Sequence, residues 1–126
     1  MYEYNAIVDR VVDGDTIDCT IDLGFKTWKK VRVRMEGINT PESRTRDLEE
    51  KELGLAAKAR LKEILELNNN KCVLKVSGLG KFGRALATVH VTTLSPTSDE
   101  SSITLINVNQ QLITEGHAVE YHGGKR

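Results

Sequence analysis

Alternating hydrophobic and polar positions dominate the first third of the chain. Apolar residues occupy every second position from Ile17 to Ile21 and again from Val31 to Met35, with polar or charged residues between them. This period of two is typical of β-strands that bury one face. A glycine-containing turn, residues 23–27, separates the two runs. Residues 4–36 are therefore predicted to form a meander of half-buried strands.

The period changes in the middle of the chain. From about Leu53 to Leu67, apolar residues recur three or four positions apart and charged residues occupy the other side, which is typical of an amphipathic helix. The apolar positions are Leu53, Ala57, Leu61, Ile64 and Leu65. The asparagine run at 68–70 is predicted to end this helix. Residues 37–52 contain a proline, many charges and no period, so they are predicted to form a long loop.

The last third of the chain indicates two further strands and a short helix. Residues 72–76 and 85–91 are strand-like and are joined by a turn at 78–83. Asn107 is suited to begin a capping helix at about 108–115. Together these elements indicate the α+β class, and five strands with Greek-key connections would form a barrel of the oligonucleotide/oligosaccharide-binding (OB) type. The pattern does not itself order the strands.

Composition indicates an ordinary globular protein. The 126 residues fit one domain, 1–126, and are 39% hydrophobic and 29% charged, with no apolar run near the roughly 18 residues that span a bilayer. The first residues lack the basic and apolar regions of a secretory signal, so a cytoplasmic location is expected. Cys19 and Cys72 stand alone in apolar strand-like contexts and are expected to be buried free thiols.

Global charge does not point to a nucleic-acid partner, because 18 basic residues balance 18 acidic ones. The basic residues are nevertheless grouped. They lie at Lys29, Lys30, Arg32 and Arg34, at Arg44 and Arg46, at Lys81 and Arg84, and at Lys125 and Arg126. If folding gathers these groups on one face, a neutral protein can still bind phosphates. The alternative is that each is a solvated surface charge.

An acidic turn, Asp13-Gly14-Asp15-Thr16, precedes the first alternating run. The period of two places Asp13 and Asp15 on the same side as the apolar residues that face the core. A carboxylate on an apolar face costs several kcal/mol unless it is paired or binds a cation, so a positive group is predicted beside it. The alternative is a plain Asp-Gly turn with both carboxylates in water.

Polar groups also follow the end of the strand that contains Arg34. Asn39 and Thr40 offer oxygens that can join Asp15 around Ca²⁺, which accepts carboxylate, amide and carbonyl ligands. Glu42 follows them and is placed to hold a water molecule against a metal-bound phosphate. The alternative is an exposed loop with a surface Arg–Glu pair.

The third polar stretch is Gly80-Lys81-Phe82-Gly83-Arg84. Its glycines permit a tight turn from which Lys81 and Arg84 project on either side of Phe82. An aromatic ring flanked by cations suits a nucleotide, because the ring stacks on the base and the charges meet the phosphates. Arg84 is the better candidate for contact with a reacting phosphate, since its planar fork binds two oxygens at once. The alternative is a glycine-rich hairpin with a buried phenylalanine.

These three stretches, in this order and spacing, resemble the staphylococcal nuclease (thermonuclease) family, and the resemblance runs from about Val8 to Tyr121. It implies an OB-type barrel with inserted helices that hydrolyses DNA and RNA with Ca²⁺. The roles it implies are metal binding by Asp15, Asn39 and Thr40 with Asp13 behind them, phosphate contact by Arg34 and Arg84, a general base at Glu42, and nucleotide contact by Lys81, Phe82 and Tyr121.

Two departures from this family bear on the function. The family has an aspartate where this chain has Asn39, so the site has one negative charge fewer and is expected to bind a divalent ion more weakly. The chain also ends at Arg126 without the long C-terminal helix of secreted relatives, and in this it resembles compact phage or prophage members.

Three hypotheses follow. The first is a calcium-dependent nuclease, expected to be monomeric, that acts on DNA or RNA and prefers single strands. The second is an OB-type domain that binds single-stranded nucleic acid but cuts it poorly because of Asn39. The third is an interaction domain that uses the barrel only as a scaffold, which the joint presence of Arg34, Glu42 and Arg84 argues against.

Overall fold

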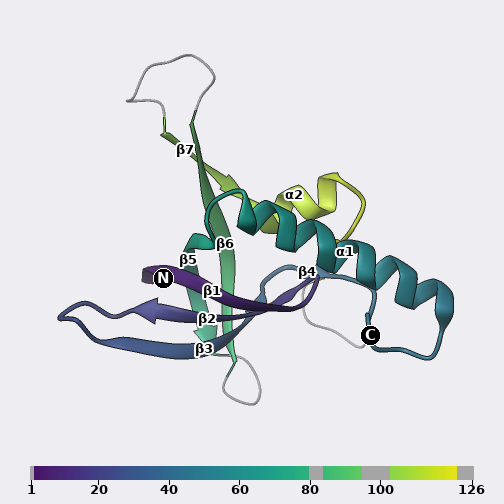
Figure 1. The fold of residues 1–126 in the computed structure, drawn as a ribbon, viewed down its shortest axis with the longest axis horizontal. Helices are drawn as coiled ribbons and strands as arrows, with labels where there is room; N and C mark the ends of the chain where they lie inside the picture. The colour runs from purple at the N-terminus through teal and green to yellow at the C-terminus, as the bar shows by residue number, and fades with distance from the viewer. Residues whose placement is uncertain (1, 80–83, 95–102, 122–126) are drawn as a thin grey trace.

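The computed structural model describes residues 2–79, 84–94 and 103–121 (Figure 1). The strands are β1 (Tyr2–Asp13), β2 (Thr16–Asp22), β3 (Trp28–Met35), β4 (Ile38–Asn39), β5 (Lys71–Leu79), β6 (Ala85–Leu94), β7 (Ile103–Asn107) and β8 (Val119–Glu120), and the helices are α1 (Leu48–Glu66) and α2 (Val108–Thr114). No helix in these described ranges is long and apolar enough to cross a membrane.

Five strands close into a barrel. Antiparallel pairing gives the order β3-β2-β1-β5-β6, and a parallel pairing of Val33–Met35 in β3 with Ala85–Ala87 in β6 joins the two ends of this sheet. Strand β1 pairs with two strands, with β5 along its first half and with β2 along its second half. The predicted α+β class and five-stranded OB-like barrel are confirmed.

Two hairpins extend beyond the barrel in different directions (Figure 1). One is the β2–β3 hairpin, whose strands pair from Thr16↔Arg34 out to Asp22↔Trp28. The other is formed by β6 and β7, which pair from His90↔Asn107 to Leu94↔Ile103. Strand β7 was not predicted, and neither was the small two-stranded sheet of β4 and β8.

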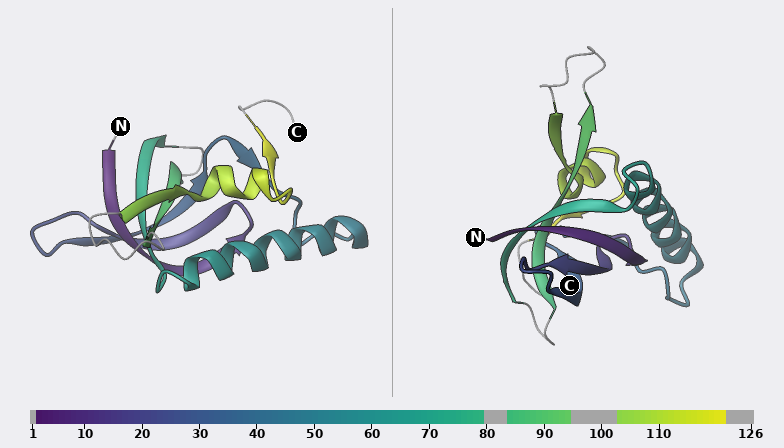
Figure 2. Two further views of the ribbon diagram at one scale, coloured as in Figure 1. Left: turned by 90° about the horizontal axis from the view of Figure 1, so that it is seen from above. Right: turned by 60° about the vertical axis from the view of Figure 1, so that its left-hand side comes forward.

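The core consists of the inward side chains of the barrel strands and one face of each helix. The fully buried side chains of the strands include Ile17, Cys19, Val33, Met35, Leu74 and Val89, and those of the helices include Leu61, Leu65, Val108 and Leu112. Helix α1 runs along one side of the barrel with α2 beside it (Figure 2). Cys19 and Cys72 are buried free thiols, as predicted, and burial raises the pKa of each to about 12.

Helix α1 is longer than predicted at its beginning. It starts at Leu48 because the side chain of Asp47 caps it, accepting hydrogen bonds from the backbone N–H groups of Glu49 and Glu50. The prediction that Leu53 faces the core is wrong, since Leu53 is 61% exposed and Gly54 is buried instead. Helix α2 was predicted to within one residue, and Asn107 caps it by accepting from the N–H of Gln110.

Asn109 joins the elements that close the barrel. Its side-chain oxygen accepts from the N–H of Val89 in β6 at 3.0 Å, and its amide nitrogen donates to the carbonyl of Glu36, just after β3, at 2.8 Å. Asn109 is only 4% exposed, so these bonds satisfy groups that water does not reach. The residue thereby links the end of β3, which carries Arg34, to the middle of β6, the strand that follows Arg84.

Candidate functional site

A hollow of about 290 Å³ lies where the β1–β2 turn, the end of β3 and the start of β6 meet. The residues that line it are Asp13, Asp15, Thr16, Arg34, Asn39, Thr40, Pro41, Glu42, Arg44 and Arg84. Every residue predicted for metal binding or catalysis therefore borders one space. Lys81 and Phe82, predicted to contact the nucleotide, lie outside the described residues.

Asp15 is the most enclosed acid of the hollow, with 8% of its surface exposed. One carboxylate oxygen accepts from the Thr16 hydroxyl at 3.0 Å, and the other accepts from the Thr40 N–H at 3.1 Å. The second oxygen also lies 3.5 Å from the guanidinium of Arg34. The sequence predicted a positive group beside this carboxylate, and the structure places Arg34 there.

Arg34 is held by several acceptors at once. Its guanidinium donates to the carbonyl of Met35 at 2.8 Å and to the carbonyl of Ile38 at 2.9 Å. A longer bond of 3.4 Å reaches the side-chain oxygen of Asn39, and the guanidinium carbon lies 5.9 Å from the centre of the Tyr121 ring. These contacts orient the planar donor group before any ligand arrives. Tyr121 is not among the residues that line the hollow, so it reaches the site through Arg34.

Glu42 lies exposed on the rim of the hollow, and hydrogen bonds to Asp13 and Glu50 hold the segment that carries it. The next residue, Ser43, is buried, and its hydroxyl donates a hydrogen bond to the carboxylate of Asp13. The N–H of Glu42 donates to the carboxylate of Glu50 in α1 at 3.4 Å. Asp13 was predicted to stand behind the metal ligands, and here it ties down the segment that carries Glu42.

Gly54 of α1 lets the helix approach this segment closely. A Cβ atom at Gly54 would lie 2.5 Å from the carbonyl carbon and oxygen of Glu42 and 2.7 Å from the nitrogen of Ser43. Real Cβ atoms are not found so close to backbone atoms, so a larger residue would push the helix and the segment apart. Glycine at this position is therefore part of what places Glu42.

The chain matches the family model of staphylococcal nuclease homologues over residues 32–126. It belongs to this family. Membership places the chain among nucleases and nucleic-acid-binding proteins. A comparison with curated proteins found no match.

The staphylococcal nuclease match begins inside β3, so it does not include the acidic turn. Asp13 and Asp15 enter the hollow because β1 and β2 pair with each other up to the turn and β2 pairs with β3. The contribution of the acidic turn is therefore a result of the geometry and not of the family match.

The donor set of the hollow fits a hard cation. Among the described residues, no three carboxylate, imidazole or thiol side chains come close enough to hold an ion by themselves. Asp15, Asn39 and Thr40 nevertheless border the same space, and each has a side-chain oxygen, the donor that Ca²⁺ and Mg²⁺ prefer. Asn39 brings an amide oxygen without a charge, so its contribution to binding a divalent ion is weaker than that of a carboxylate.

Sequence reasoning missed four residues of the site. Arg44 adds a third guanidinium to the hollow, and Thr16 binds Asp15. Ser43 and Gly54 hold the segment of Glu42. The signal for Arg44 was present in the basic group at Arg44 and Arg46, but no local pattern distinguishes a buried Ser43 or a closely packed Gly54 from their neighbours.

Proposed function

We propose that this protein is a calcium-dependent nuclease that hydrolyses phosphodiester bonds of DNA or RNA. The observation that carries the proposal is that one hollow of about 290 Å³ is bordered by Asp15, Glu42, Arg34 and Arg84. These residues supply a cation ligand, a proton acceptor and two phosphate-binding forks. The staphylococcal nuclease family to which the chain belongs supports a nucleic acid as the partner.

Each residue has a distinct part in the proposed reaction. Asp15, Asn39 and Thr40 would hold Ca²⁺, which supplies positive charge to a bound phosphate. Glu42 accepts the proton of the attacking water, because it is an exposed acid that borders the hollow. Arg34 and Arg84 donate hydrogen bonds to the phosphoryl oxygens as negative charge builds on them. The prior orientation of Arg34 by Asp15 and two carbonyls supports this role.

Substitution of Arg84 tests the reaction. Arg84→Ala should lower kcat on denatured DNA by about 100-fold or more, as expected when one preorganised donor is lost. Glu42→Gln should abolish most of the activity while leaving binding intact, since it removes the proton acceptor and retains the shape. Cleavage by Arg84→Ala at the wild-type rate would remove this arginine from the mechanism.

A second candidate function is binding of single-stranded nucleic acid with little cleavage. It is favoured by Asn39, whose amide oxygen is bonded to Arg34 and carries no charge for a metal ion. Denatured DNA incubated with calcium or with a chelator separates the two functions, with Asn39→Asp alongside. Strong calcium-dependent degradation by the wild type supports the nuclease. Binding without degradation, together with activity gained by Asn39→Asp, supports the binding domain.

A further inference from the structure

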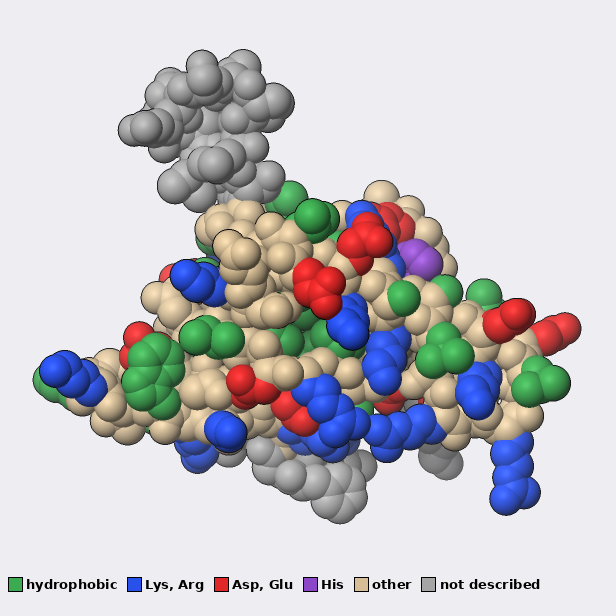
Figure 3. All heavy atoms as spheres, in the orientation of Figure 1, with side chains coloured by type: hydrophobic (Ala, Val, Ile, Leu, Met, Phe, Trp, Pro, Cys, Tyr) green, Lys and Arg blue, Asp and Glu red, His purple; other side chains and the backbone are tan. Residues whose placement is uncertain are grey.

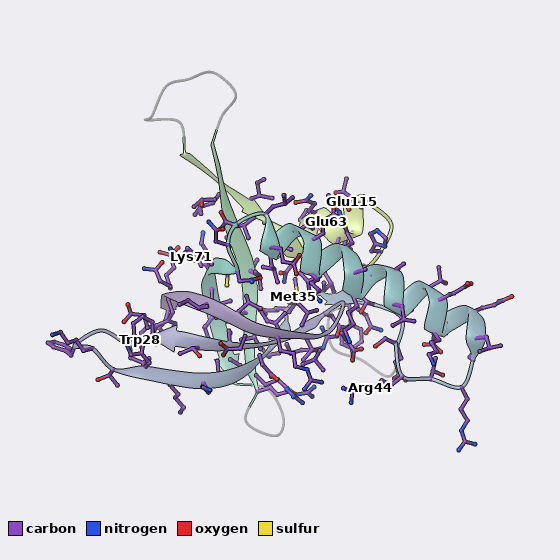
Figure 4. The ribbon with its side chains drawn as sticks, in the orientation of Figure 1. Trp28, Met35, Arg44, Glu63, Lys71 and Glu115 are labelled. Carbon is purple, nitrogen blue, oxygen red and sulfur yellow. The ribbon has the colours of Figure 1, made fainter. Side chains whose placement is uncertain are left out.

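The far end of the β2–β3 hairpin, residues 23–30, exposes aromatic rings. We refer to this segment as the arm. Phe25 is fully exposed and Trp28 is 54% exposed. Figure 4 labels Trp28 on the arm and Arg44, which lines the candidate hollow, well away from it. Single exposed apolar side chains are common, so exposure alone does not indicate a binding surface and a second observation is needed.

The backbone at the tip of the arm supplies that observation. Gly24, Phe25 and Lys26 have φ angles of 82°, 54° and 60°, which lie in the left-handed region. A bulky residue such as phenylalanine rarely adopts this conformation. The turn is closed by hydrogen bonds between Leu23 and Thr27 and between Thr27 and Gly24, both 2.9 Å long. The fold thus holds Phe25 in an unfavourable conformation that presents its ring to solvent, as is found where a side chain contacts a ligand.

Three lysines lie in the same segment as the two rings. No ion pair is recorded for Lys26, Lys29 or Lys30 with any described residue. The acids nearby are engaged elsewhere, since Asp22 accepts from the N–H of Gly24 and Asp18 is paired with Arg32 at 2.8 Å. Figure 3 shows basic and hydrophobic side chains together at this end of the molecule. Aromatic rings interleaved with ammonium groups suit single-stranded nucleic acid, because bases stack on the rings and phosphates meet the charges.

Strand β3 connects the arm to the candidate hollow. Alternate residues of a strand share one face, so Trp28, Lys30, Arg32 and Arg34 follow one another on one face of β3. The opposite face carries the exposed Lys29 at its arm end and the buried Val33 and Met35 at its site end. The six-residue step from Arg34 to Trp28 spans about 20 Å. OB-type domains bind roughly 4–16 nucleotides, so a single strand engaged at Arg34 is long enough to reach the arm.

We propose that the arm is a second contact surface for single-stranded nucleic acid, in which Phe25 and Trp28 stack on bases and Lys26 and Lys30 bind phosphates. This inference rests on the proposed function, because it extends the strand bound at Arg34. The arm captures and holds a long substrate, and it takes no part in hydrolysis of a short one.

The fluorescence of Trp28 gives a direct test, because the chain contains one tryptophan. The Glu42→Gln protein, with calcium present, is titrated with a dinucleotide and with a single strand of about twelve nucleotides. The longer strand should quench Trp28 and the dinucleotide should not. Substituting Phe25→Ala, Lys26→Gln and Lys30→Gln should weaken binding of the longer strand roughly ten-fold or more.

Cleavage activity provides the second measurement, and for it the protein retains Glu42. The same arm substitutions should lower kcat/KM on the longer strand by roughly ten-fold and leave kcat/KM on the dinucleotide unchanged. The matched control replaces Lys51 and Lys62, two exposed lysines of α1, with glutamine, which removes the same charge from another surface. This control should bind and cleave like the wild type.

The outcomes are distinguishable. If the longer strand is cleaved but neither quenches Trp28 nor depends on the arm, the arm proposal is wrong and the nuclease proposal stands. If the α1 control loses as much affinity as the arm variant, binding depends on overall charge and the arm proposal is wrong. If the arm variant aggregates while its affinity for the longer strand is unchanged, the lysines serve to prevent the edge of β3 from pairing with another chain. This outcome also overturns the arm proposal. If neither substrate is bound or cleaved, the proposed function itself fails.

Discussion

The two ends of the β2–β3 hairpin are built in opposite ways. At the site end, Arg34 donates to two carbonyls and lies beside Asp15, and only 18% of its side chain is exposed. At the arm end, Phe25 and Lys26 project from a left-handed turn and contribute nothing to the core. Rigid, enclosed donors suit a reacting phosphate, which needs groups already in place. Exposed rings and ammonium groups suit a flexible single strand of nucleic acid, because stacking and charge contacts form without an exact geometry.

The largest expected effect comes from Arg34→Lys at the site end. Lysine retains the charge but lacks the planar fork that binds two oxygens. Loss of this donor should lower kcat on a dinucleotide by about 100- to 1000-fold. Arg32→Lys is the matched control, because Arg32 lies two residues away on the same face and is paired with Asp18. An equal loss of activity in both variants would show that the guanidinium of Arg34 has no specific role at the site end of the hairpin.

The next effect tests the fixed framework behind the site. Asn109→Ala removes the partners of the Val89 N–H and the Glu36 carbonyl. Buried groups without partners cost about 1–3 kcal/mol each, so the free energy of unfolding should fall by roughly 2–4 kcal/mol. Denaturant unfolding measures this change, with Asn5→Ala on the exposed side of β1 as a control expected to stay within about 0.5 kcal/mol. A loss no greater than that of the control would show that Asn109 does not secure the barrel closure.

A smaller effect is expected from Gly54→Ala, which adds one methyl group against the segment of Glu42. Overpacking of this kind costs about 1–3 kcal/mol, and the displaced segment should lower kcat more than it raises KM. Gly78→Ala is the control, since a Cβ there meets no atom within 4 Å. Ser43→Ala should act in the same direction, and Ser43→Thr should restore part of the activity by retaining the hydroxyl that bonds to Asp13. Unchanged turnover in Gly54→Ala would mean that the close contact does not place Glu42.

What the sequence predicted follows from local chemistry. The burial of Asp15 agrees with an extension of the period of two in β2 back into the turn, and the start of α2 comes from the cap at Asn107. The start of α1 was missed because residues 49–52 are all charged, so the apolar period does not extend back to the cap at Asp47.

The missed parts of the site depend on contacts between distant segments. Gly54 is needed only because the Glu42 segment crosses the helix there. Arg44 lines the hollow next to Ser43, which is hydrogen-bonded to Asp13, 30 residues earlier in the chain. These contacts form between segments that are separated in the sequence. A periodic pattern of apolar residues does not predict them.

The smallest effect concerns the ion pair that joins α1 to the end of α2, which we call the clamp. Arg60 of α1 donates to both oxygens of Glu115 at 2.6 and 2.9 Å. These bonds, with a further one from Gln111, lower the pKa of Glu115 from 4.5 to about 2. The stabilisation is therefore complete above pH 4.5 and is lost as the pH falls toward 2.

Because this pair is partly exposed, its contribution should be about 1 kcal/mol or less. Glu115→Gln should lower the free energy of unfolding near neutral pH, and the difference from wild type should shrink as the pH falls below 4.5. Urea unfolding across this range measures it, with Glu66→Gln, an exposed acid of α1, as the control. A difference between Glu115→Gln and wild type that is independent of pH would show that the clamp acts through shape rather than through charge.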